Sequence, residues 1–172
     1  MTASMTLEAR IARAFAMDDE TWARHANPWS VYTRFTALPL LLLALWSHAW
    51  FGWGALVPIV LACAWIWFNP RIFDRPRSTD SWAARATFGE RLWLDRKRLV
   101  VPRRHRGLPT LLGAFAGLGF VIAVWGALAN ALWPMLFGLL LSVAAKLWFC
   151  DRMVWLYEDM AAQEPRLKDW VR

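Results

Sequence analysis

The sequence contains little cysteine, and two long stretches of it contain no charge. Only two of the 172 residues are Cys, too few for the disulfide framework of a small secreted domain. Residues 35–68 and 107–145 contain no Asp, Glu, Lys or Arg. A helix of a soluble protein needs a polar face, and these stretches provide none. Because a membrane-spanning helix needs about 20 apolar residues, each stretch predicts a hairpin of two such helices.

Motifs for several kinds of chemistry are also missing. The sequence has no Walker loop, no Gly-x-Ser-x-Gly elbow, no paired Cys-x-x-Cys motifs and no multi-histidine box. Apart from Arg34 near the start of the first span, His48 is the one His or charged residue in the predicted spans, and it lies near an outer turn, which disfavours proton-coupled transport. His25 and His105 are predicted to be cytoplasmic and His48 external, so one protomer cannot provide two histidine ligands for a haem within the membrane. We therefore predict no cofactor.

Local chemistry predicts where the four helices begin and end. Asn27 can cap a helix whose first residue is Pro28, and Pro109 can open another. We expect spans over about 28–50, about 55 to Phe68-Asn69-Pro70, 109–126 and 132–150, with turns at 51–54 and 129–130. The last helix has no breaker at its membrane exit and is expected to continue into water through residues 151–159. Pro39 and Pro58 are expected to kink their spans.

The charge distribution predicts the orientation. Residues 69–106 contain 11 Lys+Arg and four acids, whereas basic and acidic residues balance in 1–34 and in 146–172. The whole net charge of +7 therefore lies in the central connection. By the positive-inside rule, both termini and this connection are predicted to be cytoplasmic, in a multi-pass protein of the inner membrane. The predicted segments are an amphipathic N-terminal segment (1–27), the first hairpin (28–69), the basic connection (70–107), the second hairpin (108–150) and the C-terminal helix and tail (151–172).

The tryptophans support this topology. There are 14, and ten of them fall at the predicted membrane boundaries. Indole rings concentrate in the headgroup region, so the pattern predicts two interfacial belts. The outer belt contains Trp46, Trp50, Trp53, Trp125 and Trp133, and the cytoplasmic belt contains Trp29, Trp65, Trp67, Trp148 and Trp155.

Two segments outside the spans are predicted to form interfacial helices. One is a short N-terminal helix with an apolar stripe of Leu7, Ile11 and Phe15. The other lies in the basic connection, is capped by Thr79 or Asp80, and has one face made of Trp82, Ala86, Gly89 and Trp93. Its other positions are rich in Arg, which favours binding to anionic lipid headgroups of the bilayer. Without a recognisable nucleic-acid-binding motif, no nucleic-acid partner is predicted.

Polar residues gather where the predicted helices leave the membrane on the cytoplasmic side. This predicted rim consists of Arg24, His25, Asn27, Arg34, Asn69, Arg71, Glu90, Arg91, Asp151, Arg152, Glu158 and Asp159. His25 with acids of the fourth helix can bind a divalent metal or act as a base, and Arg34, Arg71 and Arg152 can clamp a phosphate or carboxylate. The alternative is a solvated rim of capping residues and salt bridges, because helix ends collect such residues in any case.

Blocks within this rim resemble an uncharacterised family of small prokaryotic membrane proteins that is defined only as a domain of unknown function. The resemblance rests on Trp22–Arg34, on Asn69-Pro70-Arg71, on Gly89-Glu90-Arg91 and on Asp151–Met160, and it extends from about Met17 to Met160. It implies a polytopic membrane protein and supplies no activity, substrate or cofactor.

Together these features predict an all-α integral membrane protein with four transmembrane helices in two hairpins. The function favoured is that of a non-enzymatic accessory or scaffold subunit, or a homo-oligomer packed through small residues of the third and fourth helices. Gly113, Ala116, Gly117 and Gly119 provide such small surfaces. The alternative is a membrane-interface enzyme, or a protein that binds a metal or an anionic headgroup at the cytoplasmic rim.

Overall fold

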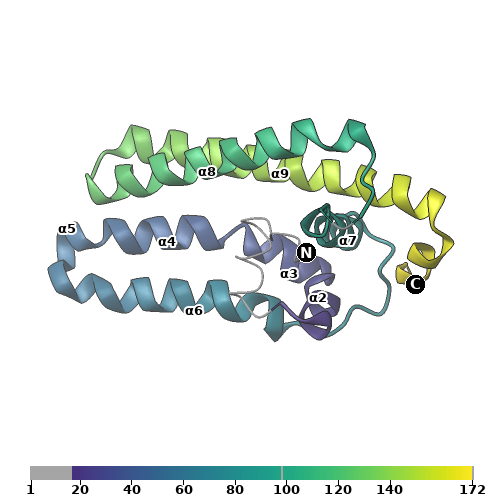
Figure 1. The fold of residues 1–172 in the computed structure, drawn as a ribbon. Coiled ribbons are helices and arrows are strands. Elements are labelled where there is room, and N and C mark those ends of the chain that lie inside the picture. Colours follow the sequence, from purple (N-terminus) through teal and green to yellow (C-terminus); the bar gives the residue numbers. More distant parts are fainter. Residues whose placement is uncertain (1–16, 98, 172) are drawn as a thin grey trace, which may run out of the picture. The chain divides into compact units, whose positions relative to one another are not determined.

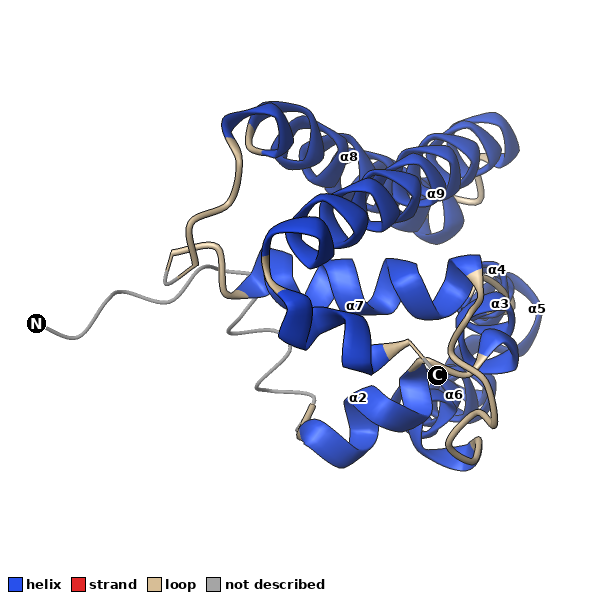
Figure 2. Cartoon of the chain, turned by 90° about the vertical axis from the view of Figure 1, so that its right-hand side faces the viewer, coloured by secondary structure: helices blue, strands red, loops and turns tan. Residues whose placement is uncertain are grey.

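A computed structural model describes residues 17–97 and 99–171, which form helices and loops without a strand among them (Figure 2). The predicted N-terminal stripe of Leu7, Ile11 and Phe15 lies outside these residues. The α-helices are α2 (Asp19–His25), α3 (Pro28–Arg34), α4 (Ala37–Trp46), α5 (His48–Phe51), α6 (Leu56–Ile72), α7 (Trp82–Leu94), α8 (Gly107–Leu128) and α9 (Leu132–Gln163). Three 3-10 helices are η1 (Gly52–Ala55), η2 (Arg103–His105) and η3 (Pro165–Trp170).

Three helical stretches are long and apolar enough to cross a membrane. They are Pro28–Ile72 with 45 residues, Arg103–Leu128 with 26 and Leu132–Gln163 with 32. In the most apolar 18-residue segment of each stretch, only 11% to 28% of the residues are buried, so most of these side chains are at least partly exposed. The structure therefore indicates a multi-pass membrane protein with three candidate spans, where the sequence predicts four.

The chain forms two compact units. Among the described residues, the polar unit contains 17–31, 70–97, 99–109 and 150–171. The apolar unit contains Tyr32–Asn69 and Thr110–Phe149. Each unit is thus assembled from segments that are far apart in the sequence.

In the apolar unit, α4 and α6 run antiparallel and are joined by α5 and η1 (Figure 1). The reversal occurs at Gly52, whose φ of 52° and ψ of −124° favour glycine because a side chain would be strained there. This confirms the turn predicted at residues 51–54.

Helices α8 and α9 form the other antiparallel pair of the apolar unit, and the turn between them contains Asn130 with a φ of 53°. Their backbones touch at glycines: a Cβ added at Gly138 would lie 2.3 Å from the Ala123 nitrogen, and one at Gly126 would lie 2.4 Å from the Met135 nitrogen. The turn predicted at 129–130 is confirmed. Helix α9 also continues without interruption to Gln163, as its missing breaker predicts.

The first predicted span is wrong in detail, because a helix over 28–50 is interrupted between Arg34 and Ala37. The Thr36 hydroxyl donates to the Thr33 carbonyl at 2.6 Å and so competes with the helical hydrogen bonds. The predicted cap is confirmed, since the Asn27 side-chain oxygen accepts from the Trp29 backbone N–H at 3.0 Å.

The proline predictions also need correction. Pro39 and Pro58 lie in the first turns of α4 and α6, where the missing N–H costs no helical bond, so neither kinks a helix interior. Pro70 does not end its helix, and α6 continues for two residues beyond it to Ile72. In this last turn the missing proline N–H removes only one hydrogen bond.

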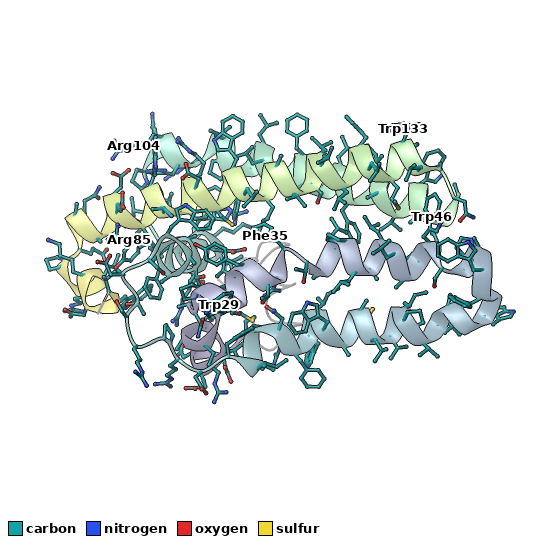
Figure 3. The ribbon with its side chains drawn as sticks, turned by 180° about the vertical axis from the view of Figure 1, so that it is seen from behind. Trp29, Phe35, Trp46, Arg85, Arg104 and Trp133 are labelled. Atoms are coloured by element: carbon teal, nitrogen blue, oxygen red, sulfur yellow. The ribbon has the colours of Figure 1, made fainter. Side chains whose placement is uncertain are left out.

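Several tryptophans predicted at the membrane boundaries are exposed, including Trp53 at 88% and Trp133 at 78%. Trp46 and Trp133 lie at the end of the apolar unit where its helices reverse direction (Figure 3). These positions fit a belt of indole rings at one boundary of the apolar segments.

In the polar unit, α7 packs its buried face against the α9 segment of the same unit. Ala86, Gly89 and Trp93 are buried, as predicted for one face of this helix. At Gly89 the backbones meet, because an added Cβ would lie 1.9 Å from the Met153 carbonyl oxygen. The predicted cap is wrong: Ser81, rather than Thr79 or Asp80, accepts a hydrogen bond from the Ala84 N–H.

Candidate functional site

Two of the predicted rim residues fasten α2 and the residue before α3 to the last turn of α6 and the loop after it. Arg24 donates to the Glu20 carboxylate at 2.9 Å and to the Arg71 carbonyl at 3.2 Å. The Asn27 side-chain amide donates to the Asp74 carbonyl at 3.0 Å. These contacts join segments of the polar unit, so Arg24 and Asn27 have a structural role there.

His25, the first candidate for a metal ligand, is buried, and its Nδ1 lies 2.9 Å from the Ser30 hydroxyl oxygen. Within the part of the chain that the structure describes, no group of three His, Cys, Asp or Glu side chains is placed to hold a metal ion. Two acids of α9, Glu158 and Asp159, instead have partners elsewhere in the polar unit.

Those α9 acids pair with basic residues from two other elements. Glu158 accepts from Arg85 of α7 at 3.1 Å. Asp159 pairs with Arg104 and with buried His105, both from η2. Burial raises the pKa of Asp159, but hydrogen bonds from His105 and Arg104 outweigh it, so its pKa lies below the ordinary value. Figure 3 labels Arg85 and Arg104 on the polar unit.

The remaining rim residues lie on several elements. The Arg152 guanidinium carbon lies 3.6 Å from the centre of the Trp155 ring, and Asp151 lies one residue earlier on α9. Arg34 and Asn69 belong to the apolar unit, where the Asn69 amide donates to the Thr33 hydroxyl at 2.8 Å. Glu90 and Arg91 lie on α7.

The polar unit has a cavity of about 350 Å³ that is both basic and aromatic. Four segments line it: α2 with its C-cap, the loop between α6 and α7, α7, and η3. The lining residues are Trp22, Ala23, Ala26, Arg75, Pro76, Arg77, Thr79, Thr87, Phe88, Arg91, Asp169 and Trp170. We call this cavity the Arg–Trp pocket, and Arg91 is the only rim residue among its lining residues.

The wall formed by η3 is held in place by aromatic and hydrogen-bonding contacts. The Trp170 ring packs against Phe88 with ring centres 5.5 Å apart, and the Arg91 guanidinium lies 5.4 Å from the centre of the Trp170 ring. The Thr79 hydroxyl donates to the Trp170 carbonyl at 2.7 Å. These contacts fix the aromatic wall beside a guanidinium.

A second set of contacts anchors η3 at its other end. The buried Tyr157 hydroxyl donates to the Leu167 carbonyl at 2.6 Å, and burial raises the pKa of Tyr157. Tyr157 also packs against Phe88 with ring centres 5.5 Å apart. The chain therefore brings its C-terminal segment beside α7 (Figure 2).

The three arginines of the pocket differ in their partners. Arg75 donates through two nitrogens to Glu20, with Nε 3.1 Å from one carboxylate oxygen. Arg91 donates through one nitrogen to Asp19. Arg77 has no hydrogen bond or ion pair with residues 17–97 or 99–171. Guanidinium groups bind carboxylates and phosphates through directional, charge-assisted hydrogen bonds, so Arg77 and Arg91 can hold an anion.

Sequence reasoning missed most of this pocket. Its residues come from four separated segments, and no spacing rule connects Trp22 with Trp170. One signal was available: Arg75-Pro76-Arg77 is a dense basic run within the segment that carries the whole net charge.

The comparisons with known proteins identify the family. Residues 6–171 match a family of unknown function, DUF6653. The chain belongs to DUF6653. This membership bears out the resemblance to a domain of unknown function over most of the sequence. No curated protein and no solved structure matches this DUF6653 member.

Proposed function

We propose that the chain crosses the cytoplasmic membrane four times and that the polar unit faces the cytoplasm. Pro28–Ile72 has 45 residues, and as one straight helix it would extend to about 68 Å, more than twice the ~30 Å hydrocarbon core. The reversal at Gly52 divides this stretch into two antiparallel segments. The basic connection, with its excess of Arg, belongs to the polar unit, which supports a cytoplasmic position.

The function that we assign to the polar unit is binding of an anionic ligand in the Arg–Trp pocket. The observation that carries this proposal is the convergence of three arginines and three aromatic rings on one cavity of about 350 Å³. Cavities of this size and character are typical of small-molecule sites. The anion can be a lipid headgroup at the membrane surface or a solute of the cytosol, since both present phosphate or carboxylate oxygens.

The lining residues favour binding over catalysis. The hydroxyl groups in the lining of the Arg–Trp pocket are those of Thr79 and Thr87. The Thr79 hydroxyl donates to the Trp170 carbonyl and the Thr87 hydroxyl to the Ala83 carbonyl. A hydroxyl that donates its proton to a backbone carbonyl is not donating it to a general base, as an activated nucleophile would. We therefore propose a membrane-anchored binding protein, with an enzyme of the membrane interface as the alternative.

Two measurements test this function. A reporter fused to the C-terminus should be cytoplasmic and one inserted after Trp53 should be external; the reverse pattern would contradict the topology. Inorganic phosphate should raise the thermal unfolding temperature of the detergent-solubilised protein relative to chloride at equal ionic strength, because a ligand of the folded state stabilises it. Arg77→Gln should abolish this rise, and an unchanged rise would contradict binding in the pocket.

The second candidate function is self-association into a homo-oligomer, and one face of α8 supports it. A Cβ added at Gly113 or Gly117 would meet nothing within 4 Å, whereas one at Gly119 would lie 2.5 Å from the Ser142 nitrogen. Gly119 is thus used within the chain, while Gly113 and Gly117, four residues apart, leave a small face open to a second helix. Gly117→Leu should lower the native mass in mild detergent, and Phe115→Trp, on the opposite face of α8, should leave it unchanged.

A further inference from the structure

The aromatic wall of the Arg–Trp pocket is larger than an inorganic anion requires. Trp22, Phe88 and Trp170 come from three different elements and all line the cavity. Phe88 and Trp170 meet edge to face, with ring planes at 67°. Aromatic rings arranged in this way bind flat apolar groups by stacking and by edge contacts. Part of the ligand is therefore expected to be flat and apolar.

The charges around the pocket limit the charge of the ligand. Asp19 and Glu20 neutralise Arg91 and Arg75, and the lining includes one more carboxylate, that of Asp169. Because Glu20 is also bound to Arg24, these three acids face four arginines, so a ligand with one negative charge completes the balance and one with several would add an excess of negative charge. A single anionic group can still be held by the directional N–H donors of Arg77 and Arg91.

The size of the pocket separates a small solute from a membrane lipid. The volume of about 350 Å³ lies near the lower end of the range for small-molecule sites. Of a phospholipid, only the headgroup would fit, and its polar glycerol and phosphate would leave the three rings without a partner. A compact molecule with one anionic group and one flat ring system would use both kinds of wall.

We propose that the Arg–Trp pocket binds a small organic monoanion with a flat aromatic group, an aryl carboxylate being the simplest example. The carboxylate lies against Arg77 and Arg91, and the ring packs against Trp170 and Phe88. This inference rests on the proposed function and specifies its ligand.

The experiment is a calorimetric titration of the full chain in mild detergent with 2-naphthoate and three comparison ligands. Decahydro-2-naphthoate has the same charge but a saturated ring, and we expect about threefold to tenfold weaker binding because aromatic contacts are lost. The neutral 2-naphthamide should bind about tenfold weaker or worse, because the charge-assisted hydrogen bonds are lost. Acetate should bind most weakly. Arg77→Gln should remove the preference for naphthoate over naphthamide. Because ligands also partition into detergent, the heat measured with this variant in the same micelles is used to correct for that partitioning.

Matched variants keep the test specific. Arg103→Gln removes an exposed charge from η2 in the same unit, outside the lining, and should not change naphthoate binding. In Trp170→Leu, naphthoate and decahydronaphthoate should bind with similar, weaker affinities. In Trp170→Phe, naphthoate should again bind more tightly than decahydronaphthoate. Each variant is first compared with the wild type in helical content and elution volume, so that a misfolded protein is recognised.

The outcomes separate this inference from the proposed function. If phosphate stabilises the protein through Arg77 but naphthoate binds no better than acetate, the ligand class is wrong and anion binding stands. If phosphatidylglycerol in nanodiscs displaces naphthoate, the pocket takes a lipid headgroup and the inference is overturned. If Arg77→Gln changes neither phosphate nor naphthoate binding, both proposals fail.

Discussion

The contact between α7 and α9 provides a sharp prediction about the polar unit that forms the Arg–Trp pocket. Gly89 has no room for a side chain: an added Cβ would lie 1.9 Å from the Met153 oxygen and 2.9 Å from the Met153 Cα. Real Cβ contacts are essentially never shorter than 3.0 Å, so in Gly89→Ala the new Cβ and the Met153 oxygen must move apart by at least 1.1 Å. The neighbouring atom is backbone and cannot rotate away.

The magnitude follows from the packing that this shift would disrupt. A gap of about 0.5–1 Å removes a quarter to a half of the dispersion energy between the atoms it separates. Overpacking costs about 1–3 kcal/mol, and a clash with backbone belongs in the upper part of this range, about 2–3 kcal/mol; the higher helix propensity of Ala offsets about 1 kcal/mol of it. We expect a net loss of about 1–2 kcal/mol, which corresponds to a fall of roughly 2–8 °C in the thermal unfolding temperature for a chain of this size.

The assay is thermal unfolding in mild detergent, combined with hydrogen exchange over residues 82–94. Gly107→Ala is the matched control, because a Cβ there would meet nothing within 4 Å. It should leave the unfolding temperature nearly unchanged, while Gly89→Ala lowers it and speeds exchange in α7. Equal unfolding temperatures for the two variants would show that α7 does not approach the α9 backbone as described.

Two further predictions concern the segments that support the pocket. Tyr157→Phe removes the buried hydrogen bond to the Leu167 carbonyl, so it should cost about 1 kcal/mol and should increase exchange in η3; unchanged exchange would contradict this anchor. Burial raises the pKa of Asp159, but hydrogen bonds from His105 and Arg104 lower it further, so its pKa lies below the ordinary value of 3.8. The ionised carboxylate therefore stabilises the folded protein fully above pH 3.8, and this stabilisation is lost as the pH falls through the lowered pKa. Asp159→Asn should therefore remove part of the acid-dependent loss of thermal stability, and an identical pH profile would contradict the pairing.

Much of the helical architecture could be predicted from the sequence because its signals are local. Three such signals each depend on a few neighbouring residues: Asn27 before Pro28, the turn at Asn130, and the absence of a helix breaker after Cys150. The structure bears out the helix cap, the turn and the continued helix that they predict. The interruption before Ala37 was missed because it depends on a hydroxyl-to-carbonyl bond from Thr36, and the nearest helix breaker, Pro39, lies three residues beyond it.

The candidate site was less predictable because its residues meet only after folding. Helix ends do collect polar residues, but in the polar unit many of these side chains pair with one another, as Glu158 does with Arg85. The pocket depends on Trp170 in the C-terminal tail and on Arg77 in the loop before α7. Neither residue belongs to a motif, and neither lies at a predicted membrane exit. The charge of the central connection favoured binding of anionic headgroups in that segment, but no local pattern singled out Arg77.

The most direct test of the account compares two arginines of the same loop. Arg75→Gln and Arg77→Gln remove the same charge from the pocket lining, but Arg75 is already bound to Glu20 and Arg77 is not paired within the described residues. The dissociation constant of 2-naphthoate is measured for both variants. The account predicts about a tenfold or greater loss for Arg77→Gln and a much smaller loss for Arg75→Gln, because binding depends on a directional donor. Equal losses would show that the pocket attracts the anion only through its total charge, and would contradict binding through directional hydrogen bonds from Arg77.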